Sequence, residues 1–301
     1  MKSIQGKHLL TAALAAGLAA TTAHAQYTPA DNRAITLAPA EATATTGDAG
    51  DDAKDQEAEL AKKLQNPVAA LISVPFQNNW DFGIGPAHAM KYTCNIQPVV
   101  PIGISDDWNL IIRTIVPVIY QEALVDNPAA PNGLGQSHSG FGNTTQTFFF
   151  SPKAPVGGWI IGAGPVGYYP TASDENLGPG AWGAGPSIVA LQQKDGFTYG
   201  ALLNQIWSFS SWDNQEVNAA FLQPFVSYTT KTYTTFTVNS ETTYNWVTHE
   251  ATAPMNFMVQ QLVKIGGVPV AFQLGYRYYV EKPDGGPDWG LRFAVTLLFP
   301  K

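Results

Sequence analysis

The stretch that decides the fold reads Asp107-Trp108-Asn109-Leu110-Ile111-Ile112-Arg113-Thr114-Ile115-Val116-Pro117-Val118-Ile119-Tyr120-Gln121. Successive side chains of a β-strand point to opposite faces, so one face here carries Trp108, aliphatic residues and Tyr120, while Asn109, Arg113 and Gln121 lie on the other. At ~3.3 Å per residue and a ~45° tilt, Trp108 and Tyr120 are ~28 Å apart, close to the height of an outer-membrane apolar band. The stretch therefore predicts a strand that crosses a membrane.

The same alternation recurs along the chain from residue 70 to residue 299. We expect about twelve strands, an even number as in bacterial single-chain barrels. They are predicted at residues 70–83, 89–101, 107–121, 141–151, 156–169, 181–193, 197–210, 217–229, 232–246, 255–265, 268–281 and 288–299. The predicted fold class is all-β, a transmembrane antiparallel up-and-down β-barrel with a short N-terminal helix.

Connections and aromatic residues favour a membrane barrel over a soluble one. Short turns, such as residues 193–196 and 266–267, alternate with longer polar loops, such as 122–140 and 170–180, as expected for periplasmic turns and outer loops. A soluble β-sandwich or lipocalin-like barrel also alternates apolar and polar residues, but it buries its apolar face. Aromatic residues near strand ends instead suit two membrane interfaces, and the candidates for these girdles are Trp108, Tyr120, Trp159, Trp207, Trp289 and Phe299.

The N-terminal residues predict export. Lys2 and Lys7 precede a short apolar run at residues 9–20, and Ala23-His24-Ala25 matches a cleavage site, which together indicate a signal peptide at residues 1–25. We expect the mature chain to begin near Gln26. Cys94 is the one cysteine, which excludes an intramolecular disulfide framework.

Residues 26–57 are rich in Ala, Thr, Asp and Pro without periodicity, and they predict a flexible acidic linker. Much of the net charge of −7 lies there, which argues against a nucleic-acid partner. Residues 56–65 then carry helix formers with apolar Leu60, Ala61 and Leu64 at helical spacing. This predicted helix precedes the barrel domain, 58–301, and is either a plug or periplasmic foot, or only a connecting helix.

Polar side chains on the non-lipid faces are candidates to line the lumen. Arginine facing lipid at the bilayer midplane would cost about 2–4 kcal/mol, so basic residues on these strands should point inward. They either form a polar pathway that favours anions, or brace a closed barrel with Glu241 and Glu281 as partners. The lumen candidates are Lys91, Gln97, Asn109, Arg113, Gln273, Arg277 and Arg292.

No constellation in the sequence supports catalysis, a metal site or a cofactor. Ser137-His138-Ser139 is the one His/Ser cluster, but neighbouring strand residues face opposite ways, so a lipid hydrolase is the weakest functional alternative. His88, His138 and His249 stand apart without metal-binding spacing. Gly162-Ala163-Gly164 lacks the strand-to-helix context of a phosphate loop and indicates close packing in the barrel wall.

Several motifs resemble a known family. Asn66-Pro67-Val68-Ala69-Ala70-Leu71-Ile72-Ser73-Val74-Pro75-Phe76-Gln77, residues 107–113, Gln146-Thr147-Phe148-Phe149-Phe150-Ser151-Pro152 and the closing residues 289–301 resemble the bacterial outer-membrane transporters of the phenol-degradation (MetA-pathway) type, often mislabelled neuromedin U. The resemblance spans residue 58 to the end and implies a β-barrel with a loosely defined transport role. Two departures are Asn143, where the family tends to have Asp, and Pro300-Lys301 after the terminal aromatic Phe299.

The sequence thus predicts a non-enzymatic channel or transporter in the cell outer membrane of a Gram-negative bacterium, with a polar lumen. Its solute is small, with aromatic and other small organic compounds as candidates. The expected partners are outer-membrane lipids and the barrel-assembly machinery. A non-conducting structural or adhesive barrel is the main alternative.

Overall fold

The computed structural model describes residues 48–122, 135–212 and 215–300. The predicted signal peptide, 1–25, and residues 26–47 of the predicted linker lie outside this part. The described residues form one helix, α1 (Asp48–Leu64), and fifteen strands. The strands are β1 (Ile72–Ile84), β2 (Ala89–Ile96), β3 (Val99–Gly103), β4 (Trp108–Gln121), β5 (His138–Phe141), β6 (Thr144–Pro152), β7 (Ile160–Tyr169), β8 (Ala181–Lys194), β9 (Phe197–Ser211), β10 (Asn218–Thr229), β11 (Thr234–Ser240), β12 (Thr242–Asn245), β13 (Glu250–Ile265), β14 (Val268–Glu281) and β15 (Trp289–Phe299).

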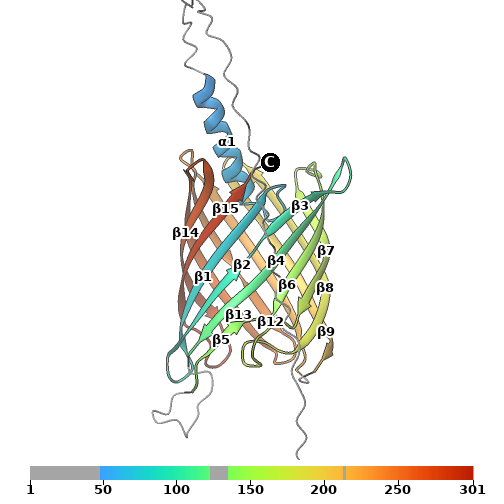
Figure 1. The fold of residues 1–301 in the computed structure, drawn as a ribbon, viewed down its shortest axis with the longest axis vertical. Helices are drawn as coiled ribbons and strands as arrows, with labels where there is room; N and C mark the ends of the chain where they lie inside the picture. Colours follow the sequence, from blue (N-terminus) through green and yellow to red (C-terminus); the bar gives the residue numbers. More distant parts are fainter. Residues whose placement is uncertain (1–47, 123–134, 213–214, 301) are drawn as a thin grey trace, which may run out of the picture. The chain divides into compact units, whose positions relative to one another are not determined.

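The strands close into an antiparallel barrel, as Figure 1 shows. β1 pairs with β15 at the closure between the first and last strands, and β9 pairs with β10 on the far side. Three positions in the wall are each shared by two short strands, β2 with β3, β5 with β6 and β11 with β12, so that the wall has 12 strands. The predicted fold class is confirmed.

Two of the predicted strands are interrupted, at Gln97-Pro98 and at Glu241. Proline has no N–H to donate to the sheet, and the wall continues past Pro98 through the Gln97 N–H to the Pro75 carbonyl (2.9 Å) and the Thr114 N–H to the Pro98 carbonyl (3.0 Å). At the second break the Glu241 N–H reaches the Pro254 carbonyl at 3.4 Å, beside an irregular register at residues 253–254. Alternation alone predicted continuous strands at 89–101 and 232–246, because it does not register such local bends.

Other boundaries also differ from the predictions. The helix begins at Asp48 and not at residue 56, so the stretch predicted as linker, 26–57, ends within α1. Acidic residues favour the first turns of a helix, whereas apolar spacing, on which the prediction rested, begins only at Leu60. β13 starts at Glu250, before the predicted 255, and β7 starts at Ile160, after the predicted 156. The segment predicted at 141–151 corresponds to β6, and β5 ends at its first residue, Phe141.

We distinguish the two ends of the barrel by the elements that lie at each. The "helix end" is where β1 begins, β15 ends and the short turns at residues 195–196 and 266–267 lie, and α1 is at this end (Figure 1). The "loop end" is the opposite one. No helix in the described residues is long and apolar enough to cross a membrane.

The outer wall is apolar and the interior is mixed. The outer face carries large apolar side chains that are at least one-third exposed. Examples are Phe272, Leu274 and Tyr276 on β14 and Ile188 on β8. All six predicted girdle aromatics, Trp108, Tyr120, Trp159, Trp207, Trp289 and Phe299, are among these exposed residues. Such a surface is unfavourable in water and suits the hydrocarbon core of a membrane.

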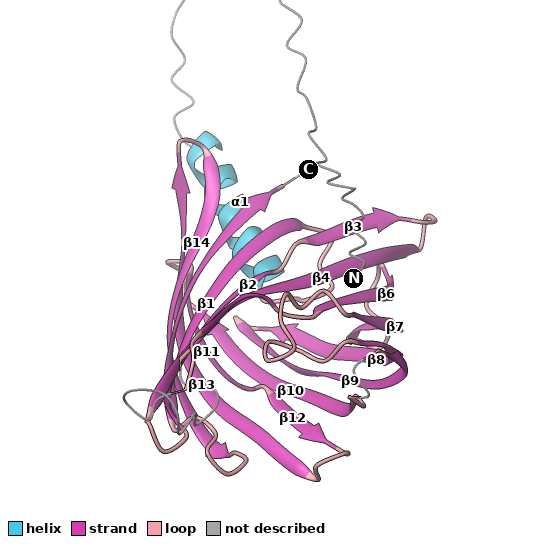
Figure 2. Cartoon of the chain, turned by 60° about the horizontal axis from the view of Figure 1, so that its bottom comes forward, coloured by secondary structure: helices cyan, strands magenta, loops and turns pink. Residues whose placement is uncertain are grey.

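The last turns of α1 and the residues between α1 and β1 pack inside the helix end of the barrel. Leu60 and Ala61 of α1, with Ala69 and Leu71, form one buried cluster with Leu262, Ala271 and Leu298 from the inner faces of β13, β14 and β15. Val68 belongs to a second cluster on the opposite side of the interior, with Ile111, Phe149, Val189, Leu191 and Leu202. Figure 2 shows α1 beside β14 at the mouth of the barrel, and Figure 1 labels β15 next to it.

Candidate solute pathway

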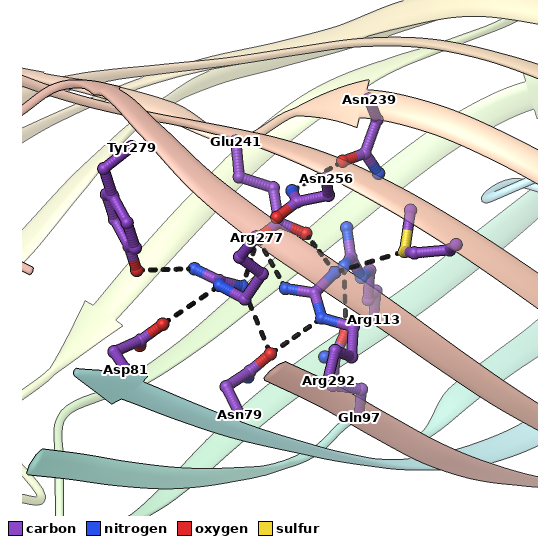
Figure 3. Close-up of polar contacts among 11 residues, drawn as sticks. Asn79, Asp81, Gln97, Arg113, Asn239, Glu241, Asn256, Arg277, Tyr279 and Arg292 are labelled. Atoms are coloured by element: carbon purple, nitrogen blue, oxygen red, sulfur yellow. Dashed lines mark hydrogen bonds and ion pairs between the residues drawn. The ribbon is translucent and has the colours of Figure 1, made fainter. Parts of the chain in front are cut away.

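A carboxylate near the middle of the barrel interior binds two arginines. Glu241, at the break between β11 and β12, accepts hydrogen bonds from both terminal nitrogens of Arg292, each at 2.8 Å, and from Nη1 of Arg277 at 3.2 Å (Figure 3). Paired donation by one guanidinium to one carboxylate is the strongest common geometry for this ion pair. Residues from β14 and β15 are therefore tied to the wall strand formed by β11 and β12.

Strand β1 completes this charged network. Asn79 Oδ1 accepts from Arg292 Nε at 2.7 Å and from Arg277 Nη1 at 3.1 Å, while the Asp81 carboxylate lies 3.1 Å from Arg277 Nε. Arg277 Nη2 also donates to the hydroxyl of Tyr279 at 3.0 Å. Both arginines are buried, and a buried guanidinium is tolerated because its charge is paired with carboxylates, although Arg277 Nε itself makes no hydrogen bond.

The network needs a residue without a side chain at position 290. A Cβ built at this position would lie 2.5 Å from the Asp81 carboxylate and 2.7 Å from the Trp80 carbonyl. Any larger residue would displace Asp81 from Arg277. The glycine between Trp289 and Leu291 is thus required by the close approach of β1 to β15.

Arg113 also lies in the interior, but no hydrogen bond joins it to the network of Glu241, Arg277 and Arg292. Its Nη2 donates to Gln97 Oε1 at 2.9 Å, and no carboxylate of the described residues lies within ion-pair distance of it. Gln97 sits at the break between β2 and β3, so the irregular wall places this amide opposite Arg113 (Figure 3).

Two cavities lie on either side of the network. The inner cavity, of about 230 Å³, is bounded at the helix end by residues 63–67, Ala69 and Leu71, and is lined further in by Arg113, Glu241 and Arg292. The outer cavity, of about 380 Å³, is lined by Asp81, Lys91, Gln121, Arg277 and Tyr279. Glu241 and Gln77 line both, which places the charged network between them.

The segment from Leu60 to Leu71, which we call the plug segment, bounds the inner cavity at the helix end. The Gln193 side chain donates to the Lys62 carbonyl at 2.8 Å, and Lys264 pairs with Glu57 of α1 at 3.0 Å. Gly162 makes room for this segment, because a Cβ there would lie 3.1 Å from the Val68 side chain. Its close packing is the role that the Gly162-Ala163-Gly164 pattern indicated.

The predicted lumen candidates separate into three places. Gln97, Arg113, Gln273 and Arg292 line the inner cavity, and Lys91 and Arg277 line the outer one. Asn109 lines neither; it is half-buried near the helix end, opposite Gly103 and Ser151 on the neighbouring strands.

Sequence reasoning did not identify Asn79, Asp81 and Tyr279 as part of the interior, and it named Glu241 only as a bracing partner. Glu281, the other partner named, is exposed. A signal existed for Asp81, since it follows the alternation of the inward face of β1, in register with Lys91 and Gly290. The pairing of Glu241 with Arg292 joins residues 51 positions apart and left no local signal.

The loop end holds a histidine–carboxylate pair. His138 Nδ1 lies 3.2 Å from Asp174 Oδ2. Hydrogen bonds from the backbone and side chain of Asn176, with the neighbouring His138, lower the pKa of the Asp174 carboxyl below its usual value. In the described part of the chain no serine is hydrogen-bonded to His138, and no group of three or more His, Cys, Asp or Glu residues is arranged to hold a metal ion.

Comparison with known proteins adds a structural likeness. No family model matches the sequence, and no match is found among curated proteins. Among solved structures, an outer-membrane channel from Pseudomonas putida F1 aligns over 76% of this chain and 94% of its own, with 15% identity and a TM-score of 0.56. The two chains share a fold. The NanC porin (10% identity, TM-score 0.45, 76% of this chain and 100% of its own) and outer-membrane phospholipase A from Escherichia coli (11%, 0.42, 82% and 98%) are more distant.

Proposed function

We propose that this chain is an outer-membrane channel that passes small solutes through the barrel interior. The observation that carries the proposal is the pair of cavities, each lined in part by polar side chains, on the two sides of one charged network. A barrel that served only as a scaffold would gain more stability from an apolar filling. Replacing a buried ion pair by well-packed apolar residues of similar volume is often neutral or stabilising. Charged constrictions of this kind set selectivity in channels.

The exposed aromatic and aliphatic outer wall supports placement in the outer membrane, with lipids as partners and the barrel-assembly machinery as the route of insertion. Membrane-spanning β structure must be closed so that every backbone group is paired, which this barrel satisfies. Export by a cleavable signal peptide at residues 1–25 belongs to the same proposal. The resemblance of residues 66–77 and 107–113 to transporters of the phenol-degradation type supports a transport role.

Two elements stand in the path. The plug segment lies at the helix end and the Glu241–Arg292 pair lies between the cavities, so passage requires one or both to move. The plug segment is held by apolar packing in the two buried clusters and by the hydrogen bond from Gln193 to the Lys62 carbonyl. The network is held by several charge-assisted hydrogen bonds. We therefore assign opening to the plug segment and selection to the network.

Liposome swelling tests the proposal. Proteoliposomes containing the folded protein should swell in isotonic solutions of small sugars and organic acids, and much less in solutions of oligosaccharides. Vesicles with the same amount of heat-unfolded protein serve as the control. Absence of swelling with every small solute, for protein whose folding is confirmed on unboiled gels, would favour the non-conducting structural barrel.

A further inference from the structure

Arg113 differs from the other two arginines of the interior because no carboxylate of the described residues forms an ion pair with it. Arg277 and Arg292 are matched by Glu241 and Asp81, all in direct ion-pair contact. Lys63, which also lines the inner cavity, is paired with Glu59 of α1 at 2.7 Å. Arg113 remains as a guanidinium on the cavity wall whose one hydrogen-bond partner in the described residues is the neutral amide of Gln97. The Glu241 carboxylate lines the same cavity but is beyond ion-pair distance of Arg113 and already binds Arg277 and Arg292, so the remaining donors of Arg113 are available to a ligand.

A guanidinium in this position favours a carboxylate. Arginine presents five N–H donors in a planar fork, of which Gln97 occupies one, and two parallel donors match the two oxygens of a carboxylate. Such charge-assisted bonds are stronger in a partly enclosed site than at the surface, where water competes. The half-buried Arg113 side chain meets this condition.

The rest of the cavity wall favours hydroxyl groups. Amide side chains from five further strands line it, together with the hydroxyls of Ser227 and Thr237; the amides are Gln77, Gln223, Asn239, Gln260 and Gln273. Gln260 and Gln273 bond one another at 3.4 Å, whereas no hydrogen bond to the side chain of Gln77 or Gln223 is present among the described residues. An amide offers both a donor and an acceptor, as a hydroxyl ligand requires.

The size of the cavity limits the ligand. At about 230 Å³ it is smaller than the ~300–1,000 Å³ pockets that hold drug-sized molecules. Apolar side chains, among them Phe225 and Val99, share the wall with these polar groups.

We propose that Arg113 and the surrounding amides form a binding site for a small monocarboxylate that bears several hydroxyl groups. The carboxylate pairs with Arg113, and the hydroxyls bond the side chains of Gln77 and Gln223. The inference rests on the proposed channel function and names the class of solute that the channel would select.

Calorimetric titration of the folded, detergent-solubilised protein with gluconate tests the site. Gluconate should bind saturably, and sorbitol, which has the hydroxyls without the carboxylate, should bind at least about tenfold more weakly, as expected for loss of a charge-assisted pair. Benzoate, with a carboxylate and no hydroxyls, should also bind more weakly. These comparisons need no variant.

Variants then locate the binding. Arg113→Gln should weaken gluconate binding by about tenfold or more, and Arg113→Lys should recover part of it. Gln223→Leu should weaken gluconate more than benzoate. Lys231→Gln, which removes an exposed positive charge in the turn after β10, is the matched control and should bind as the wild type does.

The outcomes separate the site from the channel. Gluconate binding that is absent, or unchanged by Arg113→Gln in a folded protein, overturns the site even if the barrel conducts ions. Benzoate binding as tight as that of gluconate overturns the assignment of the hydroxyls. Gluconate binding that depends on Arg113 in a barrel that passes no solute supports the site and refutes the channel.

Discussion

Both terminal nitrogens of Arg292 donate to the two carboxylate oxygens of Glu241, each at 2.8 Å, across the interior of the barrel. Arg292 is on β15, whereas Glu241 lies in the gap between β11 and β12, so the pair joins wall strands that are not neighbours in the sheet. It therefore both braces the barrel and divides the interior into two cavities.

Glu241→Gln should destabilise the barrel, because it leaves two buried arginines without their shared carboxylate. Removing one partner of a buried pair costs about 3–5 kcal/mol. The temperature at which the folded band disappears from unboiled gels should fall. Glu281→Gln, which removes an exposed carboxylate near the end of β14, is the control and should leave that temperature unchanged. Equal effects of the two changes would contradict the role of Glu241.

Arg113→Glu should shift the ion preference of the channel toward cations. It reverses a fixed charge on the cavity wall, where bulk water and salt screen weakly. The reversal potential in a KCl gradient measures this, and Arg113→Gln should give an intermediate value. Arg113 makes a single side-chain hydrogen bond, so the neutral variant should melt close to the wild type. A large loss of stability in Arg113→Gln with no change in reversal potential would assign Arg113 to bracing.

Val68→Asp should raise the conductance of the barrel by expelling the plug segment from its seat. Val68 is buried among apolar residues of β4, β6, β8 and β9, where an unpaired carboxylate is strongly disfavoured. Val68→Ala keeps the segment apolar and is the control.

Gly162→Val tests the packing site of Val68 by changing the barrel wall. Its side chain would press on Val68, since even a Cβ lies 3.1 Å away, so the conductance should rise as it does for Val68→Asp. If both variants fold and conduct as the wild type does, the plug segment does not limit passage.

Leu274→Arg should impair insertion, because this leucine is 60% exposed near the middle of β14 on the outer wall. Arginine facing lipid costs about 2–4 kcal/mol at the midplane and about 0–1 kcal/mol near an interface. Ile265→Arg, at the last residue of β13, is the matched control and should assemble almost normally. Equal assembly of the two variants, measured by heat-modifiability of the membrane fraction, would contradict the membrane placement.

Much of the wall could be predicted from alternation. Every predicted strand has a counterpart, because lipid on one side and an interior on the other impose a two-residue period that local sequence records. The breaks at Gln97-Pro98 and Glu241 could not be predicted in this way, since they depend on hydrogen bonds between strands.

The interior was less accessible to sequence reasoning. The inward direction of Arg113, Arg277 and Arg292 follows from the cost of placing them in lipid. Which of them is paired depends on Asp81 and Glu241, residues remote in sequence whose approach is set by barrel closure. The seat of Val68 depends likewise on Gly162, on a wall strand far along the chain.

Single-channel recording in planar bilayers tests the central claim most directly. The folded wild-type protein should show discrete conductance steps in KCl, with a preference for anions that matches the unpaired charge of Arg113. Val68→Asp should show larger steps or longer openings. Repeated reconstitution of folded wild-type and Val68→Asp protein without any conductance would contradict the account and leave a closed, structural barrel.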